Sequence, residues 1–234
     1  ICVCTDLDEV FEKGWRKYLE DSWVGSTSRA RYNYNWSLDD NNRPLVNFYI
    51  DKIHQRKNYK WTHPVHEVLT FLGDKENIIT IDNIVLNHYP DKSKSRSQYL
   101  NLLELSHKEN PDDDRTLHYL GREYMYYGRW NEAIDTLIKH TKIESAWYLE
   151  RAASMRFISR CYQHLGRDDE ALIWLNKAVL TSPSAREPYV EIAFLKFKQK
   201  KYMEVITTLL KAKLISKNEL LYINEPFCFD STID

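Results

Sequence analysis

The second half of the chain repeats itself at nearly constant intervals, and this repeat restricts the fold more than any other feature. Tyr124 and Tyr162 are 38 residues apart, and so are Gly128 and Gly166. Apolar residues at helical spacing, with glycine between paired segments, predict helix–turn–helix units that stack on one another. We therefore expect residues 92–234 to form an all-α domain.

The spacing then shortens, because Ala178 and Ala212 are 34 residues apart. A 34-residue period, with small residues where helices cross and glycine at the turn, is typical of tetratricopeptide repeats. The first interval is longer by about one helical turn. Stacked helix pairs of this kind bind peptides, dimerise or support a neighbouring domain, so the repeat predicts a fold and leaves the function open.

Residues 1–91 have a different pattern, in which helix and strand periods alternate. Residues 10–19 carry an apolar face of helical period directly after acidic residues that suit a helix N-terminus. Residues 30–38 alternate between apolar and polar side chains, which predicts a half-buried strand that a turn joins to a second β-rich run at 45–50. A further β-branched run covers 78–86. The pattern predicts an α/β or α+β domain.

Composition excludes several classes of protein. With 43% hydrophobic residues among 234, the chain can bury a substantial core. Its net charge of −1 gives no general attraction to nucleic acid. No apolar segment approaches the roughly 20 residues that span a bilayer, and the first residues do not resemble a signal peptide. We expect a cytoplasmic protein that binds no nucleic acid and has no membrane span.

The acidic cluster Asp6-Leu7-Asp8-Glu9 follows a short apolar run at residues 1–5. Two carboxylates at spacing i, i+2 after a buried strand can converge on one divalent cation, which in turn can hold a diphosphate. The alternative is that Asp6 or Asp8 caps a helix. Nucleotide-binding α/β folds usually place several strand–helix units before such a site, so we expect this chain to be the second part of a longer domain.

Four motifs precede the helical repeats. They are Asp6-Leu7-Asp8-Glu9, Lys52-Ile53-His54, Trp61-x-His63-Pro64-Val65-His66-Glu67-Val68-Leu69 and Leu86-Asn87-His88-Tyr89. Together with the repeats, they resemble bacterial family 2 glycosyltransferases fused to tetratricopeptide repeats, whose relatives glycosylate ribosomal peptides. The resemblance implies a partial GT-A fold over residues 1–91, an α/β fold with a mixed sheet. It also implies Mn²⁺ or Mg²⁺ and a nucleoside diphosphate sugar as donor.

The resemblance assigns roles to individual residues. Asp6 and Asp8 would hold the metal ion, and His88 would complete its shell, although His88 is equally explained as an ordinary histidine at a strand end. Glu67 is the candidate general base on chemical grounds and not through the resemblance, because an inverting transfer needs one carboxylate near the acceptor to take its proton. The alternative is a rigid loop around Glu67 whose histidines are buried and hydrogen-bonded. The candidates for contact with donor or acceptor are Trp61, His63, His66, Lys52 and His54.

The sequence thus predicts a metal-dependent glycosyltransferase acting on a nucleotide sugar and a peptide or glycan acceptor. The repeats would assist acceptor binding or form a homodimer. The alternative is an inactive protein that serves as a tetratricopeptide module for peptide binding or dimerisation. A glycoside hydrolase is a weaker third class, because only the presence of carboxylates supports it.

Overall fold

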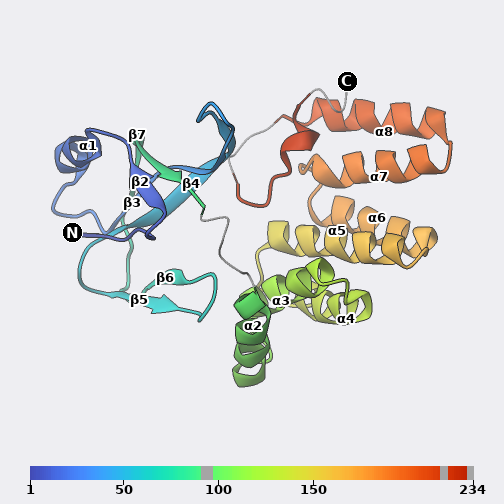
Figure 1. The fold of residues 1–234 in the computed structure, drawn as a ribbon, viewed down its shortest axis with the longest axis horizontal. Helices are drawn as coiled ribbons and strands as arrows, with labels where there is room; N and C mark the ends of the chain where they lie inside the picture. Colours follow the sequence, from blue (N-terminus) through green and yellow to red (C-terminus); the bar gives the residue numbers. More distant parts are fainter. Residues whose placement is uncertain (91–96, 217–220, 231–234) are drawn as a thin grey trace. The chain divides into compact units, whose positions relative to one another are not determined.

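The computed structural model describes residues 1–90, 97–216 and 221–230. The chain divides into two compact units, which comprise residues 1–95 with 219–222 and residues 96–218 with 223–234. The predicted boundary between residues 91 and 92 lies outside the described residues. Figure 1 draws both units as a ribbon and labels most of their helices and strands.

The first unit is built around a five-stranded sheet of order β1-β4-β3-β7-β2 (Figure 1). Its strands are β1 (Cys2–Val3), β2 (Glu9–Phe11), β3 (Arg29–Leu38), β4 (Pro44–His54) and β7 (Ile78–His88). Strand β3 pairs with β4 in antiparallel orientation and with β7 in parallel orientation. The predicted hairpin and the predicted mixed sheet are therefore confirmed.

A helix, α1 (Trp15–Ser22), and a separate two-stranded hairpin of β5 (Tyr59–Thr62) and β6 (Val68–Phe71) belong to the same unit. The helix predicted at residues 10–19 begins later, because β2 pairs with β7 and Gly14, at φ 89°, precedes the first helical turn. The core of the unit comprises Leu19, Ala30, Tyr32, Tyr34, Ile53, Ile81, Ile84 and Leu86.

The GT-A fold implied by the family resemblance is not shown by this unit. The apolar run before the acidic cluster forms only the two-residue strand β1. That strand lies at the edge of the sheet, where Val3 is exposed, and not in a buried position. The geometric premise of the metal site, a pair of carboxylates at the end of a buried strand, therefore does not hold.

The second unit is helical, as the repeat predicts (Figure 1). Its helices are α2 (Ser97–Glu109), α3 (Asp114–Tyr126), α4 (Trp130–Thr141), α5 (Tyr148–His164), α6 (Asp168–Thr181), α7 (Glu187–Lys198) and α8 (Tyr202–Leu214), followed by the 3₁₀ turn η1 (Pro226–Cys228). Helices α3 and α4, α5 and α6, and α7 and α8 form three successive pairs. Within the described ranges, no helix is long and apolar enough to cross a membrane.

The helix pairs repeat in detail. Gly128 and Gly166 lie in the turns of the first two pairs at φ 71° and 72°, and Lys200 has φ 60° in the third. Gly121 lets α3 approach α4 closely, because a Cβ atom at this position would lie 2.4 Å from Cγ of Leu137. The predicted small residues at helix crossings and the predicted glycine turns are thus confirmed.

Candidate functional site

Glu9 is the centre of the acidic cluster, although the sequence drew attention to Asp6 and Asp8. Its side chain is 1% exposed and accepts hydrogen bonds from the hydroxyl of Tyr34 at 2.8 Å and from Nζ of Lys52 at 3.1 Å. Lys52 Nζ also lies 3.1 Å from Oδ2 of Asp6, whose side chain is 71% exposed. An ammonium group therefore pairs with both carboxylates.

The charge of Lys52 is maintained by these contacts. Burial lowers the pKa of the Lys52 ammonium, but the charges of Glu9 and Asp6 outweigh burial and leave this pKa above its ordinary value. The same carboxylate acts on Tyr34, whose pKa is raised by burial and then by the charge of Glu9. The cluster is a buried ion pair with its hydrogen bonds satisfied, which is how proteins accommodate charge in a core.

Asp8 and His88 come close to each other, with 3.7 Å between Oδ2 and Nε2. Nδ1 of His88 donates to the main-chain carbonyl of Trp36 at 2.9 Å, so Nε2 is the ring atom that faces Asp8. Asp6 does not join them, because it pairs with Lys52. The part of the chain that the structure describes contains no group of three or more His, Cys, Asp or Glu residues that could hold a metal ion. The three predicted ligands do not fit one ion, and Mn²⁺, Mg²⁺ and the nucleotide sugar stay predictions.

The Trp-x-His-Pro-Val-His-Glu motif forms the end of β5 and the loop to β6. His63 and His66 have φ of 69° and 54°, so the loop turns through left-handed residues. Trp61 and Glu67 are exposed. The hairpin of β5 and β6 belongs to a different sheet from β2, which begins just after Asp8, and from β7, which ends at His88. The predicted base and the predicted metal ligands therefore come from different sheets of this unit.

His54, a predicted substrate contact, is part of the packing between the sheet and this hairpin. Its Nδ1 lies 2.7 Å from the main-chain oxygen of Gln55, and its ring lies 4.8 Å from that of Tyr59. Arg29 adds to the same packing by donating to the main-chain oxygen of Leu69 at 2.8 Å. Both side chains are buried and fasten the hairpin to the large sheet.

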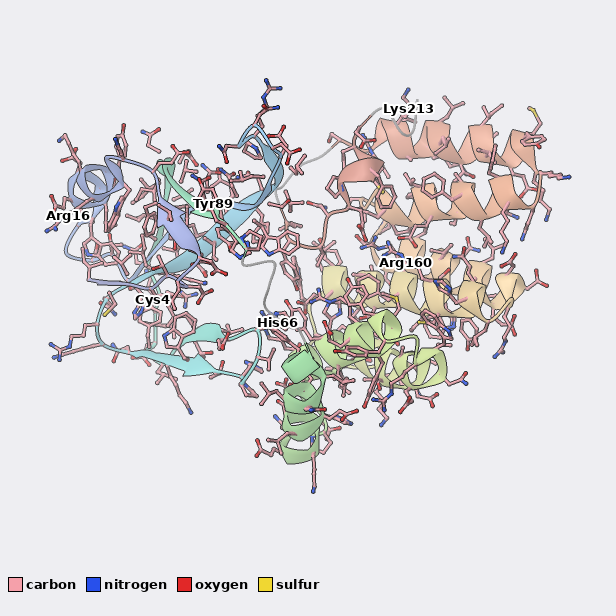
Figure 2. The ribbon with its side chains drawn as sticks, in the orientation of Figure 1. Cys4, Arg16, His66, Tyr89, Arg160 and Lys213 are labelled. Atoms are coloured by element: carbon pink, nitrogen blue, oxygen red, sulfur yellow. The ribbon has the colours of Figure 1, made fainter. Side chains whose placement is uncertain are left out.

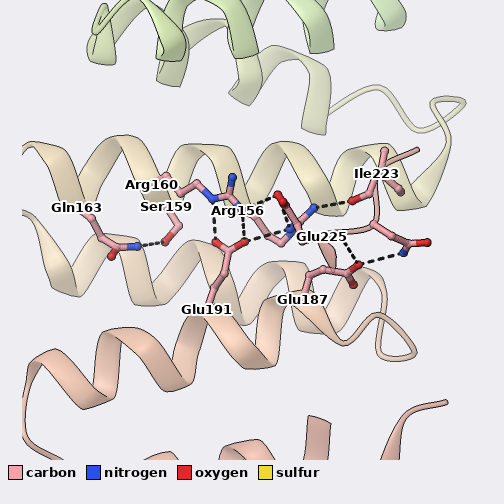
Figure 3. Close-up of polar contacts among 9 residues, drawn as sticks. Arg156, Ser159, Arg160, Gln163, Glu187, Glu191, Ile223 and Glu225 are labelled. Carbon is pink, nitrogen blue, oxygen red and sulfur yellow. Dashed lines mark hydrogen bonds and ion pairs between the residues drawn. The ribbon is translucent and has the colours of Figure 1, made fainter. Parts of the chain in front are cut away.

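Figure 3 shows a polar network on α5 and α7. It was not predicted from the sequence. Arg156 and Arg160 lie one turn apart on α5, and both face Glu191 of α7. Arg156 Nη1 is 3.0 Å and Arg160 Nη2 is 2.7 Å from Oε1 of Glu191. Glu225, from the segment after α8, lies 2.7 Å from Nη2 of Arg160.

This network holds an extended stretch of the chain (Figure 3). Arg156 Nη2 donates to the main-chain oxygen of Ile223 at 3.2 Å. Glu187 accepts from Nδ2 of Asn224 at 3.0 Å and from the main-chain N–H of Glu225 at 3.3 Å. Glu225 itself has an extended conformation, with φ −99° and ψ 114°. Side chains of α5 and α7 thus bind both the main chain and the side chains of this segment.

A pocket of about 520 Å³ adjoins the network and shares Arg160 with it. Figure 2 labels Arg160 on α5. The pocket is lined by Met125, Tyr126, Trp130, Arg160, Gln163 and His164. The rings of Trp130 and His164 stack at 4.2 Å with 3° between their planes, which makes one wall flat and rigid. Tyr126 is exposed at the pocket.

Comparisons with known proteins found solved structures that are similar to part of the chain. No family model and no curated protein matches the chain. A structure of MamA is 19% identical, with a TM-score of 0.45 over 55% of this chain and 76% of that one. Another MamA structure is 21% identical, with a TM-score of 0.43 over 51% of this chain. The match covers 66% of that MamA chain, just under two thirds of its length. A structure from work on PilF of Pseudomonas aeruginosa is 14% identical, with a TM-score of 0.44 over 51% of this chain and 53% of that one.

These findings correct the predicted family. The similar structures named above are of MamA and PilF, and none of them is a glycosyltransferase. The resemblance to family 2 glycosyltransferases was therefore wrong, and so was the prediction of a glycosyltransferase enzyme. Of the features predicted together with that family, only the tetratricopeptide repeat is supported.

Proposed function

We propose that the chain acts as a protein-interaction module whose helical repeats bind an extended segment of a partner protein. The observation that supports this most directly is the segment from 223 to 225, which α5 and α7 hold through Arg156 and Glu187. Those two side chains bind a main-chain carbonyl and a main-chain N–H, which any polypeptide offers. The surface therefore has the chemistry to hold a peptide.

The pocket beside Arg160 gives such a peptide a place for one large side chain. Trp130 and His164 form its flat wall, and Tyr126 is exposed beside them. Rigid aromatic residues and arginine dominate the binding energy of protein interfaces, because they bury large areas at a small entropic cost. We expect an apolar or aromatic side chain of the partner to occupy this pocket.

The test uses randomised peptides displayed on phage and selected on the full chain. Binding of the selected peptides is then measured to the unchanged chain and to Tyr126→Ala. We expect Tyr126→Ala to weaken binding by about tenfold, because it removes one aromatic wall of the pocket. Tyr202→Ala is the matched control, since Tyr202 is similarly exposed but lies on α8. Selected peptides that bind both variants equally well, or a selection that yields none, would contradict the proposal.

A second candidate function is self-association through α8. Met203, Ile206, Leu210 and Leu214 recur at helical spacing on this helix, and each is between 52% and 87% exposed. Apolar side chains exposed together along one helix mark an interaction surface, so this stripe calls for a covering partner. A second copy in antiparallel orientation would bring Glu204 opposite Lys211, two exposed residues of opposite charge that flank the stripe.

The mass of the protein in solution tests this second candidate. Sedimentation equilibrium over a range of concentrations is expected to show a dimer for the unchanged chain and a monomer for Leu210→Glu. The charge would be buried at the centre of the interface without a partner. The control is Leu180→Glu, since Leu180 is also highly exposed but lies on α6. A monomer for the unchanged chain at every concentration would exclude the α8 interface.

A further inference from the structure

We infer that residues 223–229 are an intramolecular ligand of the α5–α7 surface, and that a partner segment with the same chemistry displaces them. That chemistry is an acidic residue followed by proline and an aromatic residue, as in Glu225-Pro226-Phe227. The inference rests on the proposed function, because it requires this surface to bind a partner. It adds the class of partner sequence and the element that competes with it.

The acidic position is defined by two arginines. Arg156 is buried, and both Arg156 and Arg160 contact Glu191, so one carboxylate of α7 is shared by two guanidinium groups. Glu225 supplies the second carboxylate, at 3.5 Å from Arg156 and 2.7 Å from Arg160. A partly buried cation without a counter-charge is costly, so this position selects for an acidic side chain.

The ionisation of Glu225 agrees with this selection. Burial raises the pKa of the Glu225 carboxyl, but the charges of Arg156 and Arg160 outweigh it and bring the pKa below its ordinary value. Glu225 is therefore a carboxylate at neutral pH and forms charge-assisted hydrogen bonds with both arginines. A glutamine at this position would keep the shape and lose the charge.

The aromatic position is Phe227, two residues after Glu225. Its side chain packs against α7 and α8. The ring of Phe227 stacks on Phe194 at 5.8 Å. Cys228, next to it, is fully buried with Val190 of α7 and Ala212 of α8. The 3₁₀ turn that begins at Pro226 places these side chains against the helices. Recognition thus continues from a polar contact on α5 to an apolar contact on the last helix pair.

The helices hold residues 223–229 through side-chain contacts and not through a regular series of main-chain hydrogen bonds. The main-chain hydrogen bonds within this segment include those from Cys228 N–H to Glu225 and from Phe229 N–H to Pro226, which are local. Its contacts with the helices also include Arg186 at the start of α7, which donates to the main-chain oxygen of Cys228 at 3.3 Å and lies over the ring of Phe229. Because a tethered ligand acts at an effective concentration of about millimolar, it masks the surface from weak external ligands even when its own affinity is modest. Weakening the tethered segment should therefore expose the surface.

The experiment measures binding of a fluorescently labelled peptide with the sequence of residues 221–230, carrying Cys228→Ser to prevent oxidation. Anisotropy titrations compare the unchanged chain with a full-length Glu225→Ala/Phe227→Ala variant. We expect the variant to bind the peptide at least about tenfold more tightly, because its own segment competes less. Addition of Arg160→Ala to that variant should remove most of this gain. Tyr18→Ala/Glu20→Ala, an exposed aromatic and acidic pair on α1, is the matched control and should bind as the unchanged chain does.

Two peptides test the chemistry. A peptide with Glu225→Gln and a peptide with Phe227→Ala should each bind the weakened variant at least about tenfold less tightly than the parent peptide. Equal affinity of all three peptides would overturn the assignment of an acidic and an aromatic position. Equal affinity of the parent peptide for the unchanged chain and the weakened variant would overturn the competition.

Hydrogen exchange of the unchanged chain provides a second measurement if the weakened variant does not fold. We expect amides of residues 223–229 to exchange much faster than those of α7, and the same protection in both would overturn the inference.

Failure of this inference differs from failure of the proposed function. If phage-selected peptides bind in a manner that depends on Tyr126 but lack the acidic and aromatic positions, only the inference fails. If no peptide binds, both fail.

Discussion

The hydroxyl of Ser154 joins two buried histidines from neighbouring helices. It lies 2.8 Å from Nδ1 of His118 and 2.9 Å from Nδ1 of His140. Because a hydroxyl has one proton, it donates to one ring and accepts from the other, so the two neutral imidazoles have opposite tautomers. Burial lowers the pKa of His140 to about 4 and also lowers the pKa of His118 well below its ordinary value.

Stability should therefore fall as the pH drops below about 6.5, the ordinary histidine pKa. In that range the unfolded chain binds protons at His118 and His140 while the folded chain does not, so the free energy of unfolding decreases down to about pH 4. We expect a loss of about 2 kcal/mol for each histidine between pH 7 and pH 5. Urea unfolding at several pH values measures this loss of unfolding free energy. In His140→Asn the loss should be smaller by the amount that one histidine contributes.

Glu150 acts in the opposite direction and must be considered in that measurement. Burial raises the pKa of its carboxyl to about 6, so its contribution to stability decreases as the pH rises from about 4.5 to 6. The histidine effect is therefore cleanest between pH 7 and pH 6. An unchanged pH dependence in His140→Asn would contradict the assignment of the effect to this pair.

The turns of the helix pairs show how one element tolerates different residues. Gly166 and Lys200 are 34 residues apart, and both adopt the left-handed conformation, with φ of 72° and 60°. Glycine adopts this conformation without a steric penalty, whereas a residue with a Cβ atom pays roughly 1–2 kcal/mol. The third pair forms the same turn despite that cost, because the packing of α7 on α8 determines the conformation.

Opposite substitutions at these two positions should have opposite effects. Gly166→Ala should lower the free energy of unfolding by about 1 kcal/mol, and Lys200→Gly should raise it by a smaller amount, because glycine also gains entropy in the unfolded chain. At Gly166 a Cβ atom would meet no atom within 4 Å, so the effect reports on the backbone alone. Gly25→Ala is the control, since it too meets no atom and has no positive φ. Thermal unfolding measures the difference, and equal effects of Gly166→Ala and Gly25→Ala would contradict the argument.

Strand β3 shows where a local period fails. Strict alternation predicts that Trp36 faces the core together with Tyr32 and Tyr34. The register with β4 shifts between Asn35 and Ser37. From that point the side chains that faced the core and those that faced away exchange sides. Trp36 is therefore 49% exposed, while Asn35 is buried and hydrogen-bonds to Asn47 at 2.7 Å. Pairing with a distant strand produces the shift, so the alternation by itself could not show it.

At the scale of the whole molecule, the two compact units differ in what stabilises them. The first depends on a sheet with a buried ion pair between Lys52 and Glu9, and the second depends on repeated packing of helix pairs. Contacts that belong to different units should contribute additively to stability when they share no partners. Substitutions in the two units therefore offer a test of their independence.

Lys52→Met should destabilise the first unit by about 3 kcal/mol, because it leaves the buried Glu9 carboxylate without its cation. Calorimetry should show a shift of one thermal transition for Lys52→Met, a shift of the other for Gly166→Ala, and both shifts in the double variant. Lys17→Met is the matched control, since Lys17 pairs with Asp21 on an exposed helix face and should leave both transitions nearly unchanged. A single transition that moves with every variant would show that the units unfold together.

The sequence by itself determined the elements whose period is local. The helix pairs, their glycine turns and the hairpin of β3 and β4 follow from spacings of a few residues, because neighbouring residues on one face share one environment. Arginines at 156 and 160 and glutamates at 187 and 191 also have a visible i, i+4 pattern, which could have indicated facing helices.

The tertiary structure alone decided which partner each polar side chain has. Asp6 pairs with Lys52, 46 residues away, and not with a metal ion shared with Asp8, while Arg160 pairs with Glu225, 65 residues away. Motifs describe which residues are present, but the charge that neutralises a carboxylate is set by whichever cation the folded chain brings within a few ångströms. Contacts between residues so far apart in the chain leave no period in the sequence, and for this reason the acidic cluster suggested a catalytic metal where the fold places a lysine.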